Sequence, residues 1–171
     1  MDQPSLYDED VVAWAEQQAA AVRALGTRPD LSNALDWDNI AEEIASLGSS
    51  QVAAFESMIR LVLVHLVKHL SAPHLPPAGH WRAEPVAFQI AGRAGYRALM
   101  RRKVDLDAVW RDAVRQAEAA LHAFGNVPAA GLPDTSPFTL DDLVAVDFDV
   151  ERCLIHLAST LDPARRSRGR A

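Results

Sequence analysis

Two histidines lie one helical turn apart inside an apolar segment, RLVLVHLVKHL, at residues 60–70. An imidazole titrates near neutral pH, so it can act as a general acid or base, as a metal ligand or as a buried polar group. His65 and His69 are spaced i, i+4, which would let both rings meet one ion on the same helix face. Arg60 precedes His65 by five positions and could hold a phosphate. The segment is therefore compatible with a metal centre, an acid–base site or a packing helix.

A metal centre would need more ligands than His65 and His69. His74 and His80 follow in the sequence, and Glu42 and Glu43 could supply carboxylate oxygens. The chain contains no Glu-x-x-His and no His-Glu-x-x-His, the two motifs with which helical proteins commonly bind metals. We therefore expect no metal and no other cofactor, and we keep a His-based metal site as an alternative.

Arg60 and His65 also fit the Arg-x4–6-His pattern of the HEPN-type helical ribonucleases. In that family, paired subunits bring arginine and histidine to an RNA backbone without a metal. Within one helix the two side chains would lie about 140° apart around the axis and ~7.5 Å apart along it, so they could cooperate only in a dimer cleft. A HEPN-like, metal-independent ribonuclease or toxin–antitoxin component is the main alternative function.

A third charged feature is a run of arginines that would follow one face of a helix. Arg93, Arg97 and Arg101 are spaced i, i+4, i+8, with Arg102 adjacent, and such a stripe could contact a polyanion or a partner protein. The whole chain has a net charge of −6, with 3 basic and 11 acidic residues in positions 1–60. A solvated face, or one paired with acidic helices, is therefore the favoured interpretation, and nucleic acid is a less favoured partner.

Length and composition indicate one soluble domain of ordinary size. The chain has 171 residues, of which 49% are hydrophobic and 23% charged, values typical of a globular protein. Cys153 is the only cysteine, so no internal disulfide is required, and its apolar surroundings favour a buried structural thiol. The N-terminus lacks a signal pattern, and charged or polar residues interrupt the longest apolar run. These features predict a cytoplasmic protein that does not enter a membrane.

The apolar spacing predicts helices throughout and no strands. Asp36, Asp105 and Thr139 are suited to cap helix starts, and Gly48 is suited to end one. The helix starting near Trp81 or at Pro85 should run to about Arg102, whereas Pro73, Pro76 and Pro77 should end the one before it. The expected helices span residues 8–25, 36–47, 51–70, 81–102, 105–124, a short segment from 139, and 149–161.

Residues 51–70 form the most apolar of these helices, with apolar side chains around most of the circumference. Such a helix belongs at the centre of a bundle. The packing interpretation then places both histidines at the edge of the buried stripe, where it turns toward solvent or a neighbouring helix.

Several strings together resemble the bacterial family known as domain of unknown function 29. In sequence order they are YDEDVVAWAEQQAA, LDWDNIAEEIASLGSSQ, RLVLVHLVK, HWR and SPFTLDDL, and the likeness extends over roughly residues 7 to 148. The resemblance implies a compact all-α bacterial protein and no established activity. The family pattern resembles His-Leu-Leu-Lys-Trp at residues 65–69, so His69 stands where tryptophan is usual. The polar positions that match the family are Asn39, Glu42, Glu43, Lys68, Trp81 and Arg82.

We therefore predict an all-α, single-domain bundle of about five main helices plus one or two short C-terminal helices. The domain should cover residues 1–164, with a disordered arginine-rich tail at 165–171. The predicted function is a non-enzymatic protein-interaction or self-association module whose partner is itself, as in a dimer, or another protein chain.

Overall fold

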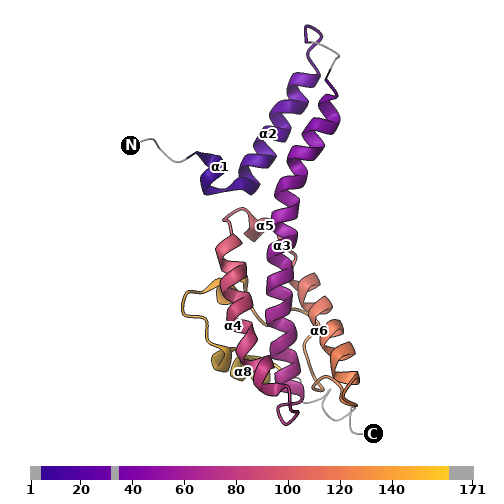
Figure 1. Ribbon diagram of the computed structural model, residues 1–171, viewed down its shortest axis with the longest axis vertical. Coiled ribbons are helices and arrows are strands. Elements are labelled where there is room, and N and C mark those ends of the chain that lie inside the picture. Colours follow the sequence, from indigo (N-terminus) through magenta and orange to yellow (C-terminus); the bar gives the residue numbers. More distant parts are fainter. Residues whose placement is uncertain (1–4, 32–34, 162–171) are drawn as a thin grey trace. The chain divides into compact units, whose positions relative to one another are not determined.

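The computed structural model describes residues 5–31 and 35–161, and every regular element in these ranges is an α-helix (Figure 1). The all-α prediction is confirmed. The predicted tail at 165–171 lies outside the described residues. The helices are α1 (Leu6–Glu9), α2 (Val11–Gly26), α3 (Trp37–Ser71), α4 (Ala78–Gly95), α5 (Met100–Lys103), α6 (Leu106–His122), α7 (Leu140–Val144) and α8 (Val150–Ser159).

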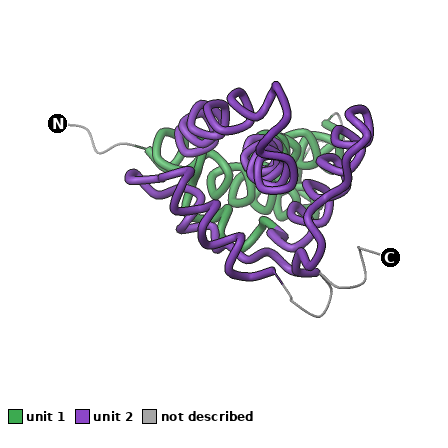
Figure 2. The backbone as a smooth tube through the Cα atoms, turned by 90° about the horizontal axis from the view of Figure 1, so that it is seen from below, with its two compact units in different colours: residues 1–55, 95–104 green, residues 56–94, 105–171 purple. Residues whose placement is uncertain are grey.

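The chain divides into two compact units that share the long helix α3 (Figure 2). Unit 1 comprises residues 1–55 and 95–104, and unit 2 comprises residues 56–94 and 105–171. Each is described by itself below. The prediction of a single helical domain over residues 1–164 stays a prediction.

In unit 1, α2 packs on the N-terminal half of α3 at a glycine. We predicted that Gly48 would end one helix and that another would begin at residue 51, and this is wrong, because α3 runs unbroken through 35 residues. Gly48 is buried, and a Cβ placed on it would lie 3.4 Å from the Cβ of Ala15 and 3.5 Å from the carbonyl oxygen of Val12. The glycine therefore permits close helix packing, and the hydroxyl of Ser49 is satisfied within the helix by the carbonyl of Ser46.

The start of unit 1 is organised by Asp10, which separates α1 from α2. The prediction of one helix over residues 8–25 missed this break. One carboxylate oxygen of Asp10 accepts hydrogen bonds from the backbone N–H groups of Val12 and Ala13, which caps α2. The other accepts from the N–H of Leu99 at 3.3 Å. One carboxylate thereby caps a helix and also fixes the segment that follows α4.

In unit 2, the C-terminal half of α3 is the core helix, so the prediction made for residues 51–70 holds for residues 59–68 but not for residues 51–54, which are exposed or half-buried. Ile59, Val62, Leu63, Leu66 and Val67 have no solvent-exposed surface. By length and composition α3 could also cross a membrane, but 44% of its most apolar window is buried inside the protein. A core helix of a soluble protein meets the same criterion, so this is weak evidence for a membrane span.

Helix α4 begins earlier and ends earlier than predicted. It starts at Ala78, not near Trp81 or at Pro85, and it stops at Gly95, after which a separate short helix, α5, holds Arg101 and Arg102. Pro85 therefore lies inside the helix and is buried. Its missing N–H leaves the carbonyl of Trp81 without the usual intrahelical bond, a cost that burial of the ring helps to offset.

The predicted caps Asp105 and Thr139 of the later helices are confirmed, and Asp149 is a further cap that was not predicted. The carboxylates of Asp105 and Asp149 accept from the backbone N–H groups of Ala108 and Arg152 at the starts of α6 and α8. Thr139 and Asp142 form a reciprocal capping box at α7. Around α3, the side chain of Leu121 on α6 shares a buried cluster with Ala72, Ala78 and Trp81.

A test of the α2–α3 packing is the substitution Gly26→Ala. The new Cβ would lie 2.6 Å from the Cβ of Trp37, which cannot move without its backbone. We expect the free energy of unfolding to fall by about 1–3 kcal/mol, measured by chemical denaturation. The control is Gly79→Ala, where no atom lies within 4 Å of the new Cβ, and this variant should be neutral or slightly stabilised. Equal effects of the two substitutions would contradict the proposed close contact.

Candidate functional site

His65 and Glu84 meet where α3 packs against α4. His65 Nε2 lies 2.7 Å from a carboxylate oxygen of Glu84, and its Nδ1 lies 2.8 Å from the carbonyl oxygen of Leu61. The histidine is 7% exposed, whereas the Glu84 side chain is 46% exposed. A neutral imidazole can donate only one of these two hydrogen bonds, while an imidazolium can donate both.

Lys68 and Trp81 complete this cluster. The ammonium of Lys68 lies 4.9 Å from the centre of the Trp81 ring and 3.5 Å from His65 Nε2. Lys68 is 9% exposed and Trp81 is 5% exposed, so this cation–π contact is largely desolvated, where it is strongest. The two family-matching residues, distant in the sequence, thus touch each other.

Burial governs the protonation of the cluster. It lowers the pKa of His65 below its ordinary value, and the nearby Lys68 adds to this effect, while Leu61 and Glu84 partly oppose it. Burial also lowers the pKa of Lys68, with Glu84 opposing. Burial therefore favours the neutral form of the imidazole, which is enclosed by the packing of α3 against α4.

Arg60 lies one turn beyond Glu56 on α3, with its charge near that carboxylate. Burial and the charge of Asp105 raise the pKa of Glu56, and Arg60 lowers it. The Nε of Arg60 is buried without a hydrogen-bond partner among residues 5–31 and 35–161. Arg60 and His65 thus have different surroundings within one helix, and the catalytic role suggested for them stays a hypothesis without further support.

His69 is used differently from His65. Its Nδ1 lies 3.2 Å from the carbonyl oxygen of Ala78, which ties the end of α3 to the start of α4. Among the described residues, no three His, Cys, Asp or Glu side chains come together in a group that could hold a metal ion. The structure therefore adds nothing in favour of a His65–His69 metal pair.

The arginine stripe does not follow one helix, because α4 ends at Gly95. Arg93 is on α4 in unit 2, while Arg97, Arg101 and Arg102 belong to unit 1. Arg97 donates to the carbonyl of Tyr96. The continuous helical stripe that we predicted is wrong, and a polyanion or partner surface at these residues stays untested.

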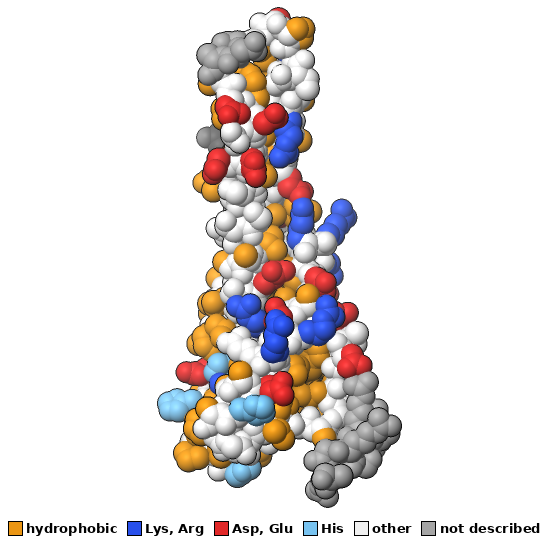
Figure 3. Space-filling view, turned by 90° about the vertical axis from the view of Figure 1, so that its right-hand side faces the viewer, with side chains coloured by type: hydrophobic (Ala, Val, Ile, Leu, Met, Phe, Trp, Pro, Cys, Tyr) orange, Lys and Arg blue, Asp and Glu red, His pale blue; other side chains and the backbone are white. Residues whose placement is uncertain are grey.

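The other family-matching residues lie on the surface or at a helix start. Asn39 donates from its side-chain amide to Asp36 at 2.5 Å at the beginning of α3. Arg82 of α4 pairs with Glu151 of α8 at 2.6 Å. Glu42 and Glu43 are exposed on α3, and Figure 3 shows acidic side chains over this part of the protein (upper part of the view). Asn39 thus stabilises a helix end, Arg82 joins two helices, and Glu42 and Glu43 contribute surface charge.

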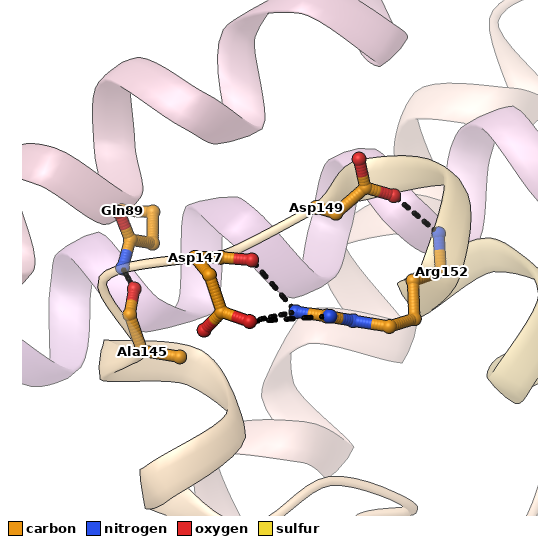
Figure 4. A network of polar contacts seen from close by, with 5 residues as sticks. All are labelled: Gln89, Ala145, Asp147, Asp149 and Arg152. Atoms are coloured by element: carbon orange, nitrogen blue, oxygen red, sulfur yellow. Dashed lines mark hydrogen bonds and ion pairs between the residues drawn. The ribbon is translucent and has the colours of Figure 1, made fainter.

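A hollow of about 470 Å3 lies beside α7 and α8, but its polar groups already hold the local structure together. Arg152 bonds the carboxylate and the carbonyl oxygen of Asp147, and Gln89 of α4 donates to the carbonyl of Ala145 at 2.8 Å (Figure 4). Hydrogen bonds from Thr139 lower the pKa of Asp142. The hollow is lined by Phe138, Asp141, Asp142, Ala145, Asp147, Arg152, Cys153 and His156.

Cys153, which lines this hollow, is buried, as the sequence predicted. It is buried, and burial raises its pKa to about 11. The thiol therefore stays protonated at neutral pH, and the thiolate needed for attack or metal binding is scarce.

The outward side of α4 is apolar as well as the inward side. Its buried residues, Trp81, Pro85, Gln89 and Gly92, all lie on one side of the helix. On the other side Val86 is 41% exposed and Ile90 is 53% exposed. Exposed alanines extend this outward stripe, namely Ala83, Ala87, Ala91 and Ala94. We call the exposed residues Ala83, Val86, Ala87, Ile90, Ala91 and Ala94 together the α4 outer face.

Sequence reasoning missed Glu84, Gln89 and the α4 outer face. Glu84 is the single acidic residue between positions 78 and 95, which was a usable signal for the partner of a buried histidine. The outer face was not predicted, because the uncertain helix start left open which side of α4 faces the core. Gln89 offered no signal, since its partner is a backbone carbonyl 56 positions away.

Comparisons with known proteins agree with this architecture. Residues 6–149 match the domain of unknown function DUF29, and the chain belongs to this family. It is also similar to a crystal structure of an α-helical protein of unknown function from Rhodospirillum rubrum, with 33% sequence identity and a TM-score of 0.79. That match covers 91% of this chain and 99% of the other. No curated protein matches the chain.

The protonation of His65 is testable through the pH dependence of stability. Because burial lowers the folded-state pKa of His65, the unfolded chain takes up the proton first as the pH falls below about 6.5. Stability from this group is therefore present above that pH and lost below it, at no more than about 1.4 kcal/mol per pH unit. Urea unfolding between pH 8 and 5 should show a smaller loss for His65→Gln than for the wild type. A larger loss in the variant would mean that Glu84 outweighs burial.

The contact shown in Figure 4 between α4 and the loop after α7 is testable at Gln89, which is 3% exposed. Gln89→Leu keeps the volume similar and leaves the carbonyl of Ala145 without its donor. We expect a loss of about 1–3 kcal/mol in the free energy of unfolding. Asp147→Asn, which weakens an exposed ion pair, is the control and should cost less than about 1 kcal/mol.

Proposed function

We propose that this member of the DUF29 family is a helical interaction module that docks another protein helix on the α4 outer face. The observation that supports this most strongly is the spacing of the exposed apolar residues on α4. Ala83, Ala87, Ile90 and Ala94 are separated by four, three and four positions and are all exposed. This spacing is the one with which helices pack along a common seam.

The side chains of the α4 outer face favour a helical partner in particular. Alanines at three of the four seam positions allow another backbone to come close, while Ile90 supplies a larger apolar contact. Other exposed apolar residues, such as Val146 and Ile155, are not part of such a row. Isolated exposed apolar side chains are ordinary on protein surfaces, whereas a periodic row is not.

The edge of the same face indicates the charge of the partner. Arg93 lies three positions after Ile90, so it borders the seam, and it is exposed without an ion pair to any described residue. Arg82 lies on the same edge of α4, eleven positions before Arg93, and forms an ion pair with Glu151. A partner helix with an acidic edge would place a carboxylate near Arg93, which favours specificity more than raw affinity.

The ribonuclease and metal hypotheses receive no comparable support. Both ring nitrogens of His65 already lie within hydrogen-bond distance of Leu61 and Glu84. Our proposal includes that this non-enzymatic module acts in the cytoplasm of a bacterium. The relative of known structure comes from Rhodospirillum rubrum, and Cys153 requires no oxidising compartment.

The proposal is testable by site-specific photo-crosslinking of the full-length protein in its own cells. Replacing Ile90 with benzoylphenylalanine should give a protein adduct on illumination, because this side chain lies at the centre of the seam. Mass spectrometry of the crosslinked peptide should show apolar residues three and four apart with an acidic residue among them. The same probe at Ile155, which is 66% exposed on α8, is the control and should give much less adduct.

Two results would contradict this function. One is an equal yield of adduct from the probes at positions 90 and 155. The other is an adduct at position 90 whose crosslinked peptide is basic or lacks a helical apolar repeat.

A further inference from the structure

We propose that Nε2 of His65 changes its hydrogen-bond partner when the ring gains or loses a proton. The protonated ring donates to Glu84 of α4, whereas the neutral ring accepts from Lys68 of its own helix. The hydrogen bond between α3 and α4 at this point therefore forms at low pH and opens at high pH. The inference goes beyond the proposed function and does not depend on what docks on the α4 outer face.

The other ring nitrogen, Nδ1, keeps one partner in both states. It lies 2.8 Å from the carbonyl oxygen of Leu61, four positions earlier on α3. A carbonyl oxygen can only accept, so this contact places a hydrogen on Nδ1. In the neutral ring this is the single ring N–H, and Nε2 then carries a lone pair. The backbone of α3 thus selects the tautomer of His65.

Two side chains of opposite chemistry lie beside Nε2. A carboxylate oxygen of Glu84 is 2.7 Å away, and the ammonium nitrogen of Lys68 is 3.5 Å away. A carboxylate only accepts hydrogen bonds and an ammonium only donates them. A protonated Nε2 can therefore bond to Glu84 and not to Lys68, whereas a lone pair on Nε2 can bond to Lys68 and not to Glu84. The protonation state of the ring decides which partner is bound.

Both partners are able to make this exchange. The side chain of Glu84 is 46% exposed, so its carboxylate can turn into water when the neutral ring no longer donates to it. Lys68 carries its ammonium on a flexible four-carbon stem and holds it 4.9 Å from the centre of the Trp81 ring. A small shift toward Nε2 gives this buried ammonium an acceptor and keeps it near the aromatic ring.

The charges around His65 place the exchange on the acidic side of neutrality. Lys68 from α3 and Glu84 from α4 are the charged side chains that act on the ring, while the Phe88 ring of α4 packs 5.3 Å from it without a charge. Burial, the largest effect, lowers the pKa of His65, and Lys68 lowers it further. The bond to Glu84 should therefore form only as the pH falls below the ordinary histidine pKa of about 6.5.

The exchange also changes a charge beside the α4 outer face. Glu84 precedes Ala87 and Ala91 by three and seven positions, so it borders that face on the side away from Arg93. With a neutral His65 the carboxylate of Glu84 is free at this edge. With a protonated His65 it is held and neutralised by the imidazolium. The pH thus controls one negative charge on the surface of α4.

Nitrogen-15 NMR of the histidine rings in the full-length protein tests the exchange directly. At high pH the two nitrogens of His65 should differ widely in chemical shift, with the hydrogen on Nδ1. As the pH falls they should converge, because an imidazolium carries a hydrogen on both. Nuclear Overhauser contacts between the ring and the Glu84 side chain should strengthen over the same pH range. The variant His65→Gln assigns the signals.

His156 provides an internal control for the tautomer. Its Nε2 lies 2.8 Å from the carbonyl oxygen of Pro137, so its neutral ring should carry the hydrogen on Nε2, opposite to His65.

Two substitutions test the partners separately by the same titration. Glu84→Gln removes the charge that stabilises the imidazolium and should lower the pKa of His65. Lys68→Met removes a like charge and the donor to the neutral ring, and should raise it. Glu118→Gln is the matched control, because Glu118 lies 4.0 Å from the exposed His122, and it should leave the titration of His65 unchanged.

Three results would overturn the inference. One is a neutral His65 with its hydrogen on Nε2, which would keep Glu84 as the partner at high pH. Another is a ring that stays neutral until the protein unfolds in acid. The third is a His65 titration that neither Glu84→Gln nor Lys68→Met changes in folded protein.

Discussion

The burial of residues 62–68, in the C-terminal half of α3, is the constraint on which the rest of unit 2 depends. Every side chain from Val62 to Lys68 is buried, so burial extends around the whole circumference of the helix and polar residues there have little access to water. His65 and Lys68 must then find partners in the protein, because an unpaired buried polar group lowers the free energy of unfolding by about 1 to several kcal/mol. Helix α4 supplies those partners through Glu84 and the ring of Trp81.

This requirement determines how α4 is oriented. Trp81 must face α3 to cover Lys68, and Glu84 must reach His65, so these two residues set the rotation of α4 about its own axis. Pro85, Gln89 and Gly92 are buried along with them. The opposite side, with Val86 and Ile90, is therefore turned outward by the same contacts. The exposure of the α4 outer face follows from the polar needs of the core helix.

The parts of the fold that local chemistry controls were accessible from sequence. Asp105 and Thr139 cap helices as expected, because a side-chain oxygen three residues before an N–H acts without any tertiary partner. Gly48 misled the prediction because the same residue suits a helix end and a close helix contact, and Ala15 decides between them. For a related reason, Glu84 could not be identified from the sequence as the partner of His65. That identification requires knowing which side of α4 faces α3.

Family likeness and chemistry point to the same interpretation of the residues around His65. Lys68 and Trp81 both match the family pattern, and here they form one contact, which gives both residues a role in the fold. An acid–base site needs an imidazole that a substrate can approach, whereas the ring of His65 packs 5.3 Å from that of Phe88 and lies behind Glu84. The exposed apolar row of α4 lies on the opposite side of that helix from this cluster, with Val86 and Ile90 turned away from the core.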